Sequence, residues 1–259
     1  MRADERDAII ARAMDTPPEA VPYLAELCAD FDELGSSVDD AMALLDGAGA
    51  PPGAAIDLGC GKGVFAIALA KRGWRVRAVD LHPPFLDEVR RRAADAGVGD
   101  RVEVVEGELE AEAARTAAGS LDLALLMSIG RPWGTLAETV GALRRLVRPG
   151  GWILIDDAYL EGDRPAGPEY DGYASLEATE RDLVAHGDAI VGRRIVSHEE
   201  GRIRHERELG WLRARGAAIV ARDPAAAPVI ERFLAQQAGA YDDLVGPVRG
   251  AMWLLRRGG

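Results

Sequence analysis

Two stretches of this 259-residue chain carry residue types that could bind a nucleotide-like molecule and move a proton. In the first, Ile56 to Val64 (IDLGCGKGV), a carboxylate precedes three glycines at alternate positions. This pattern is typical of a strand, a tight turn and a helix N-terminus, where bare backbone can approach a ligand. In the second, Asp156 and Asp157 end an apolar run. Adjacent carboxylates at the end of a buried strand are costly unless they are paired, bind a metal or exchange a proton.

Two common phosphate-binding motifs do not fit the glycine turn. A P-loop needs glycine at position 56 and Ser or Thr after Lys62, but Ile56 and Gly63 stand there. A dinucleotide fingerprint needs Gly or Ala where this chain has Val64. The cofactor must therefore be decided by the elements that follow the turn.

Strands and helices alternate regularly from residue 51 onward. Apolar runs separated by helical patterns predict right-handed βαβ units and a parallel sheet covered on both faces. One helical pattern before the fifth run is stopped by Pro149-Gly150-Gly151. We predict an α/β fold with a doubly wound, seven-stranded, mostly parallel sheet, its strands at 54–59, 74–81, 101–107, 121–128, 152–160, 189–197 and 251–257.

The segment AIDLGCGKGVFAIALA, residues 55–70, resembles motif I of the class I, Rossmann-like methyltransferases that depend on S-adenosylmethionine (SAM). Motif I of that family is a strand followed by D-x-G-x-G-x-G. The resemblance continues with an acid at the end of the second strand, Asp80, and with Gly107-Glu108 after the third, where the family usually has Gly-Asp. The resemblance implies the class I methyltransferase fold, SAM as methyl donor and S-adenosylhomocysteine as product. Within this family the chain is most similar to methyltransferases that act on small molecules.

The resemblance also implies roles for the matching positions. Asp57 and the glycines would hold the methionine end of SAM, and Asp80 would accept both ribose hydroxyls in charge-assisted hydrogen bonds. Glu108 and Leu109 would lie at the adenine, although Glu is one methylene longer than the usual Asp. The residues expected to contact SAM are Asp57, Gly59, Cys60, Gly61, Gly63, Asp80, Leu81, Glu108, Leu109, Met127 and Ser128.

Methyl transfer to oxygen or nitrogen requires an aligned acceptor and removal of its proton. In this fold the acceptor approaches over the carboxyl ends of the fourth and fifth strands. The catalytic candidates are Asp156, Asp157 and Tyr159 from that region, and His186, whose ring titrates near neutrality. Met127 and Ser128 follow the fourth strand, where catechol-type O-methyltransferases have an acidic metal ligand, so we predict no metal site.

Composition and charge argue against several other classes of partner. The formal charge of −12 argues against nucleic-acid or anionic-membrane partners, which require clustered Lys and Arg. The arginine clusters at 90–92 and 144–145 lie in helical patterns and are expected on solvated helix faces. We expect a cytoplasmic protein for three reasons. The chain has only two cysteines, its N-terminal stretch is charged, and no apolar run is long enough to span a membrane.

We therefore predict a helical N-terminal lid at 1–50, a SAM-binding core at 51–198, a helical cap inserted at 199–245 and the last core strand at 246–259. The predicted function is methyl transfer from SAM to an oxygen or nitrogen of a small-molecule substrate. A SAM-binding protein without transfer activity and a divalent-metal-dependent O-methyltransferase remain the alternatives. The sequence leaves a homodimer open.

Overall fold

The computed structural model describes residues 2–163, 170–245 and 247–259, so residues 1, 164–169 and 246 of the ranges predicted above lie outside the described residues. The chain divides into two compact units, which are described separately. One comprises residues 1–32 and 196–249, and the other comprises residues 33–195 and 250–259. The first boundary therefore falls within the range predicted as an N-terminal lid.

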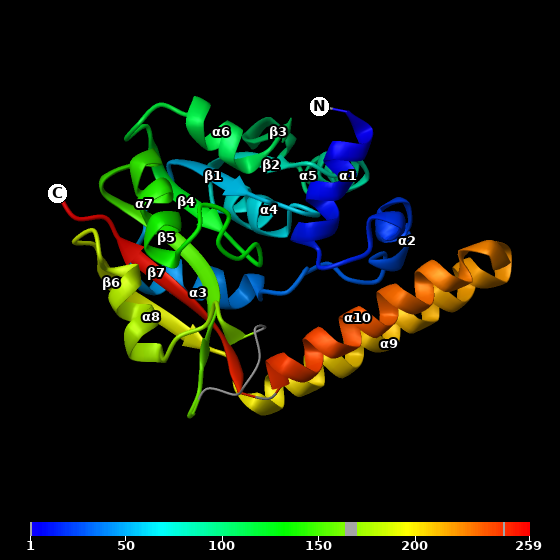
Figure 1. Ribbon diagram of the computed structural model, residues 1–259. Coiled ribbons are helices and arrows are strands. Elements are labelled where there is room, and N and C mark those ends of the chain that lie inside the picture. The colour runs from blue at the N-terminus through cyan, green and yellow to red at the C-terminus, as the bar shows by residue number, and fades with distance from the viewer. Residues whose placement is uncertain (1, 164–169, 246) are drawn as a thin grey trace. The chain divides into compact units, whose positions relative to one another are not determined.

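The second unit is built on a seven-stranded sheet with the order β3-β2-β1-β4-β5-β7-β6 (Figure 1). Strands β1 to β5 pair in parallel, whereas β6 and β7 pair antiparallel. This confirms the predicted doubly wound, mostly parallel sheet. The strands are β1 Ala54–Leu58, β2 Arg75–Asp80, β3 Val102–Glu106, β4 Leu121–Leu126, β5 Val147–Leu160, β6 Ala189–Ile195 and β7 Val248–Arg256.

Helices cover both faces of the sheet because its strands are apolar on both sides. One buried cluster joins the sheet to α3, α4 and α5, and a second joins it to α6, α7 and α8. Successive residues of β7 alternate between the clusters, with Met252 and Leu254 in the first and Trp253 in the second. The helices are α3 Val38–Gly47, α4 Val64–Lys71, α5 Pro83–Asp95, α6 Leu109–Arg115, α7 Leu136–Leu146 and α8 Leu176–Leu183, with a 3₁₀ turn at Gly99–Arg101.

Strand β5 begins earlier than the sequence indicates. The Pro149-Gly150-Gly151 segment was expected to be a turn ahead of the strand, yet β5 starts at Val147. Leu121 of β4 pairs with Val147 while Leu123 pairs with Trp152, so the intervening residues form an irregularity within the pairing. The turn residues thus bend a paired strand instead of separating it from the helix.

The first unit is helical. Its elements are α1 Ala3–Ala13, α2 Leu24–Leu27, α9 His198–Arg222 and α10 Ala227–Val245, with 3₁₀ turns at Pro18–Tyr23 and Pro224–Ala226. A Cβ on Gly216 would lie 2.8 Å from Ile230, so glycine lets α9 and α10 approach closely. Arg222 pairs with Glu26 at 2.8 Å.

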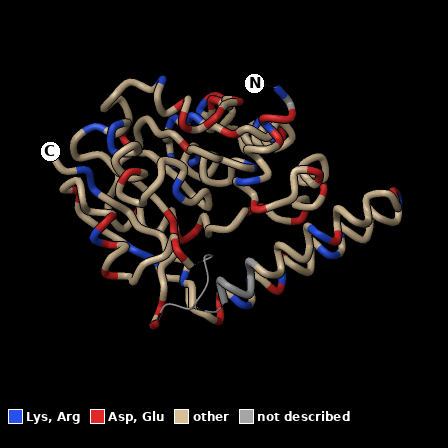
Figure 2. The backbone as a smooth tube through the Cα atoms, in the orientation of Figure 1, with Lys and Arg blue, Asp and Glu red and all other residues tan. Residues whose placement is uncertain are grey.

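Charged residues of both signs are interspersed over the chain (Figure 2). On α5, Arg90, Arg91 and Arg92 each form an ion pair with an acidic residue of the same helix. This arrangement fits the solvated helix face expected for that cluster. Among the described residues, no helix combines the length and the apolar character needed to cross a membrane.

Candidate functional site

The candidate site lies at the carboxyl edge of the sheet, where β1, β2 and β4 end beside β5, which itself continues to Leu160. Leu58 of β1 pairs with Val79 of β2 and with Leu126 of β4. Leu126 pairs in turn with Ile155 of β5. Ligands of open α/β sheets bind outside the carboxyl ends of the strands. The residues that come next at this edge are Gly59, Asp80, Met127 and Asp156.

The three glycines after β1 form the turn expected from the sequence. Gly59, Gly61 and Gly63 have φ angles of 75°, 51° and 74°, a left-handed backbone in which glycine avoids strain. The Gly59 amide donates to the Val79 carbonyl at 2.9 Å, and the Gly61 amide donates to the Asp80 carboxylate at 2.8 Å. Helix α4 then starts without a side-chain N-cap, so its first amides remain available to a ligand.

Neighbouring side chains lie close to the same glycines. A Cβ on Gly59 would lie 2.3 Å from Cδ1 of Ile129, and one on Gly61 would lie 2.9 Å from Cδ1 of Leu34. Packing therefore favours glycine here in addition to the backbone conformation, because a larger residue would displace the ends of these side chains. The sequence pattern suggested only the approach of a ligand, because nothing in it places Leu34 or Ile129 beside the turn.

Asp57 is a buried carboxylate with an unusual environment. Asp57 is 1% exposed, and among the described residues neither of its carboxylate oxygens has a hydrogen-bond partner of normal geometry. Burial, reinforced by the nearby charge of Asp80, raises the pKa of Asp57 to about 7 against the opposing effect of the Ala66 amide. An unpartnered buried carboxylate costs free energy unless a ligand supplies donors or positive charge. Asp57 is thus positioned to bind a donor group of a ligand.

Asp80 links the glycine turn to the start of α5. Its two carboxylate oxygens accept from the amides of Gly61 and His82, each at 2.8 Å. Burial raises the pKa of Asp80, and these hydrogen bonds lower it. The Leu81 amide also lowers the pKa of Asp80 as a hydrogen-bond donor. Because a carboxylate has about four acceptor positions, Asp80 keeps capacity for a further donor, such as a hydroxyl of a ligand.

The other residues expected at a SAM site occupy positions around the same edge. Cys60 is buried, and that burial raises the pKa of its thiol well above the usual value. Leu81 follows Asp80, and Met127 packs in the cluster beneath α3, α4 and α5. Glu108 is the N-cap of α6 and Leu109 its first residue. The Gly107 amide donates to the Asp80 carbonyl at 3.0 Å, so this segment adjoins the end of β2.

Asp156 is the centre of a hydroxyl-rich cluster. Its Oδ1 accepts from the Ser128 amide, and its Oδ2 accepts from the hydroxyls of Ser128 and Ser36. Burial, together with the charge of Asp157, raises the pKa of Asp156 to about 7, although the Ser128 hydrogen bonds oppose the shift. Ser128 has a φ of 58°, which is uncommon for a residue with a side chain. A carboxyl that titrates near neutral pH can act as a proton acceptor.

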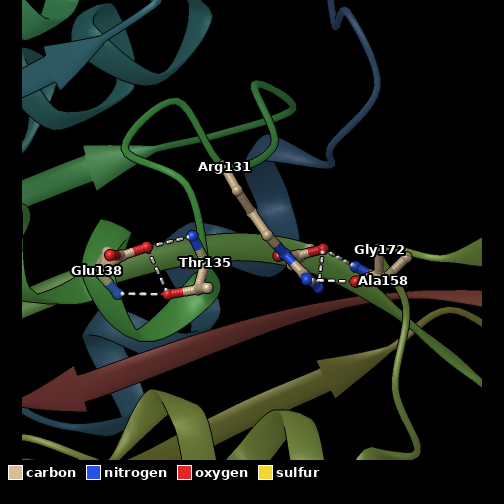
Figure 3. A network of polar contacts seen from close by, with 6 residues as sticks. Arg131, Thr135, Glu138, Ala158 and Gly172 are labelled. Atoms are coloured by element: carbon tan, nitrogen blue, oxygen red, sulfur yellow. Dashed lines mark hydrogen bonds and ion pairs between the residues drawn. The ribbon is translucent and has the colours of Figure 1, made fainter.

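Asp157 has a different environment although it is adjacent. Successive strand residues point to opposite faces, and Asp157 pairs with Arg131 at 2.6 Å and 3.2 Å. Arg131 also donates to the carbonyl of Gly172 (Figure 3). The Ala158 amide donates to Asp157 at 2.6 Å. Asp157 is 6% exposed and its charge is balanced. This arrangement favours a structural role for Asp157.

We expect Asp157→Asn to lower the free energy of unfolding by about 1.5 kcal/mol, the scale of one charged hydrogen bond. The neutral amide would leave Arg131 without its counter-charge, and partial exposure of Arg131 to water keeps the cost modest. Urea unfolding measures the change. Asp163→Asn, at an exposed position, is the matched control. Equal effects of the two substitutions would contradict the proposed role of the ion pair.

The remaining two catalytic candidates lie apart from the cluster around Asp156. Tyr159 is buried among apolar residues on the α6, α7 and α8 face. His186 is exposed, and its Nε2 lies 2.8 Å from the carbonyl of Ala137 on α7. It precedes β6, which starts at the opposite edge of the sheet from Asp156. The structure therefore does not bring Tyr159 or His186 to the site.

Three site residues were not singled out from the sequence. Ser36 precedes the serine that caps α3, Arg131 lies in the loop after β4, and Lys62 is buried with its Nζ 3.9 Å from Glu88. Only Lys62, inside the glycine motif, had a local signal. Across the part of the chain that is described, no group of three or more His, Cys, Asp or Glu side chains could hold a metal ion.

Residues 55–151 match the family model described as a methyltransferase domain. The segment matched runs from β1, through the glycine turn and Asp80, to the start of β5. This part of the chain resembles a methyltransferase domain, and it has the class I methyltransferase fold.

Relatives of the methyltransferase domain differ in what their names say they modify. A ubiquinone biosynthesis O-methyltransferase of Paracidovorax citrulli is 35% identical over 100 residues, covering 39% of this chain and 41% of that protein. A ribosomal protein L11 methyltransferase of Methylococcus capsulatus is 36% identical over 118 residues, covering 45% and 37%. The chain thus spans about two fifths of the length of these relatives.

The fold around the methyltransferase domain also matches a solved structure over most of its length. A SAM-dependent methyltransferase of Geobacter sulfurreducens, in complex with S-adenosylhomocysteine, superposes with a TM-score of 0.77 at 18% identity. The match covers 90% of this chain and 97% of that one. At this level of identity the likeness establishes a shared fold, so the chemistry must be argued from the residues of this chain.

Proposed function

We propose that this protein transfers the methyl group of SAM to an oxygen or nitrogen atom of a small-molecule acceptor. The observation that carries the proposal is Asp57, which is buried without a hydrogen-bond partner among the described residues, beside a glycine turn whose next carboxylate, Asp80, has capacity for a further donor. SAM has an amino group and a ribose diol, which are the donors that these two carboxylates lack. The solved Geobacter complex with S-adenosylhomocysteine supports the same donor.

Each part of the donor has a proposed position. Asp57 and the glycine turn bind the methionine end, and Asp80 accepts from the ribose hydroxyls. Glu108 and Leu109 bind the adenine, since their segment adjoins the end of β2. Met127 and Ser128, which follow β4, lie near the reactive methyl. These assignments follow the order of the elements along the carboxyl edge of the sheet.

Asp156 is the proposed general base, which removes the proton from the methyl acceptor. SAM supplies an electrophilic methyl group, so the protein must align the acceptor atom and remove its proton. Asp156 lies at the carboxyl edge with a pKa of about 7, near the value that suits a general base at neutral pH. A base is needed for hydroxyl and ammonium acceptors, and the O-methyltransferase among the relatives is consistent with oxygen.

The proposal is tested by measuring S-adenosylhomocysteine formed from SAM with a panel of phenols, catechols, alcohols and amines. Turnover with at least one acceptor, lost in Asp156→Asn, is the expected result. Tight binding of S-adenosylhomocysteine without turnover on any acceptor would instead favour a SAM-binding protein without transfer activity. Turnover that requires added Mg²⁺ and stops with a chelator would favour a metal-dependent O-methyltransferase.

We expect the affinity for S-adenosylhomocysteine to rise with pH through about 7. Asp57 is protonated below its raised pKa, whereas the positively charged amino group of the ligand favours the ionised form. Binding below pH 7 must therefore release a proton, and affinity falls by up to about tenfold for each pH unit. Calorimetry between pH 5.5 and 8.5 measures this slope. Asp57→Asn should bind more weakly and lose the part of the slope that Asp57 causes.

A further inference from the structure

A short segment ahead of α3, residues 33–37, lies over the carboxyl edge of the sheet; we call it the strap. Its C-terminal end is fixed to the helix. The Ser37 hydroxyl accepts from the Asp40 amide at 3.3 Å as the N-cap, and the Glu33 carboxylate accepts from the Val38 amide at 2.7 Å. Helix α3 is anchored in turn, because its apolar residues belong to the cluster beneath α4 and α5. The strap is therefore held at a defined position.

The middle of the strap packs against the loop that follows β4. Gly35 has a φ of 109°, and a Cβ there would lie 2.5 Å from the Ser128 hydroxyl. Leu34 contacts the glycine turn at Gly61. Glycine at position 35 thus lets the backbone approach Ser128 closely, which brings the next residue, Ser36, to Asp156. Ser36 is buried at this point.

Within the described residues, the side-chain and loop donors around Asp156 are divided unequally between its two oxygens. A carboxylate has about four acceptor positions. Oδ2 accepts from the hydroxyls of Ser36 and Ser128, and Oδ1 accepts from the Ser128 amide. Oδ1 therefore accepts from fewer of these donors than Oδ2 and is the oxygen better able to receive the proton of the methyl acceptor.

We propose that Ser36 is a positioning residue for Asp156: its hydroxyl holds Oδ2, so that the ionised carboxylate presents Oδ1 to the methyl acceptor. The inference rests on the proposed function of Asp156 as the base. It assigns a catalytic contribution to the strap, a segment outside the matched methyltransferase domain. A hydrogen bond donated to the charged form stabilises that form, so Ser36 also sets the pH at which Asp156 becomes ionised.

The charged groups near Asp156 have partners of their own. Asp157, next on β5, is paired with Arg131, and Glu33 on the strap accepts from the Val38 amide. On the loop after β4, Ser128 contributes only neutral donors. Within the described residues of this unit, the hydroxyl of Ser36 is thus a contact whose loss changes the environment of Asp156 without removing a charge.

The experiment compares the pH dependence of turnover for Ser36→Ala, Ser36→Thr and Ser37→Ala with that of the unmodified protein. Ser36→Ala should move the acid limb of kcat/KM to higher pH by about one unit, because losing one of several hydrogen bonds to a carboxylate raises its pKa by about that much. At a given pH on that limb, kcat/KM of the variant should be about tenfold lower than that of the unmodified protein. Ser36→Thr keeps a hydroxyl and should restore the limb. Ser37→Ala removes the N-cap of α3 and should lower the Tm without moving the limb.

A second measurement needs no acceptor and separates this inference from the proposed function. With ¹³C-labelled aspartate, the carboxyl signal that disappears in Asp156→Asn is followed by NMR during a pH titration. A rise of its pKa in Ser36→Ala alone supports the positioning role even if no acceptor is found. An unchanged pKa and an unchanged acid limb in an active enzyme would overturn the inference. Equal shifts in the Ser36 and Ser37 alanine variants would show a general loosening of the strap instead.

Discussion

Asp156→Asn is expected to lower kcat by about 10²- to 10⁴-fold, the usual contribution of a general base, while the affinity for S-adenosylhomocysteine changes little. The amide is nearly isosteric, and its oxygen can still accept from the Ser128 amide. What it cannot do is take the proton of the acceptor. Single-turnover kinetics with saturating SAM, together with calorimetry of the product, separates the two effects.

Stability provides a control for this variant. Burial raises the pKa of Asp156 to about 7, so its ionised form is disfavoured by folding, and this destabilisation appears as the pH rises from the unfolded value through 7. A neutral Asn avoids it, and the Tm at pH 8 should not fall. Asp157→Asn provides the complementary result, with lower stability and a smaller loss of turnover. Turnover by Asp156→Asn at the normal rate would show that another group accepts the proton.

Asp156 and Asp157 show which part of the site could be predicted from the sequence and which part could not. The pair Asp156 and Asp157 was predicted at the end of a strand because adjacent carboxylates after an apolar run are unusual. Which of them faces the site depends on the twist of β5 and on Arg131, which lies in another loop. Nothing local in the sequence pairs Arg131 with Asp157, so the assignment required the three-dimensional structure.

The same distinction holds for the fold. The parallel sheet was predictable because each strand and helix has its own apolar period and its own stop residues. The start of β5 was missed because Pro149 and the two glycines after it are turn residues that here bend a paired strand. Ser36 was missed because its neighbour Ser37 accounts for the capping signal. The partner of Ser36, Asp156, lies 120 positions away in the sequence.

Asp80→Ala is expected to weaken the binding of S-adenosylhomocysteine by about 10- to 150-fold, corresponding to the roughly 1.5–3 kcal/mol of charged hydrogen bonds. The Asp80 carboxylate has capacity for a ribose hydroxyl in addition to the amides from which it already accepts. Calorimetry measures the loss. Glu103→Gln removes an exposed carboxylate from the neighbouring strand and should leave the affinity unchanged.

The alanine variant could also act indirectly, because Asp80 holds the Gly61 amide in the glycine turn. A second ligand distinguishes the two causes. Methylthioadenosine keeps the ribose and adenine but lacks the amino-acid end of S-adenosylhomocysteine. If Asp80 binds the ribose, Asp80→Ala weakens both ligands by the same factor, whereas Asp57→Asn weakens only S-adenosylhomocysteine. If Asp80 only shapes the turn that follows Asp57, Asp80→Ala weakens S-adenosylhomocysteine while methylthioadenosine binds as before.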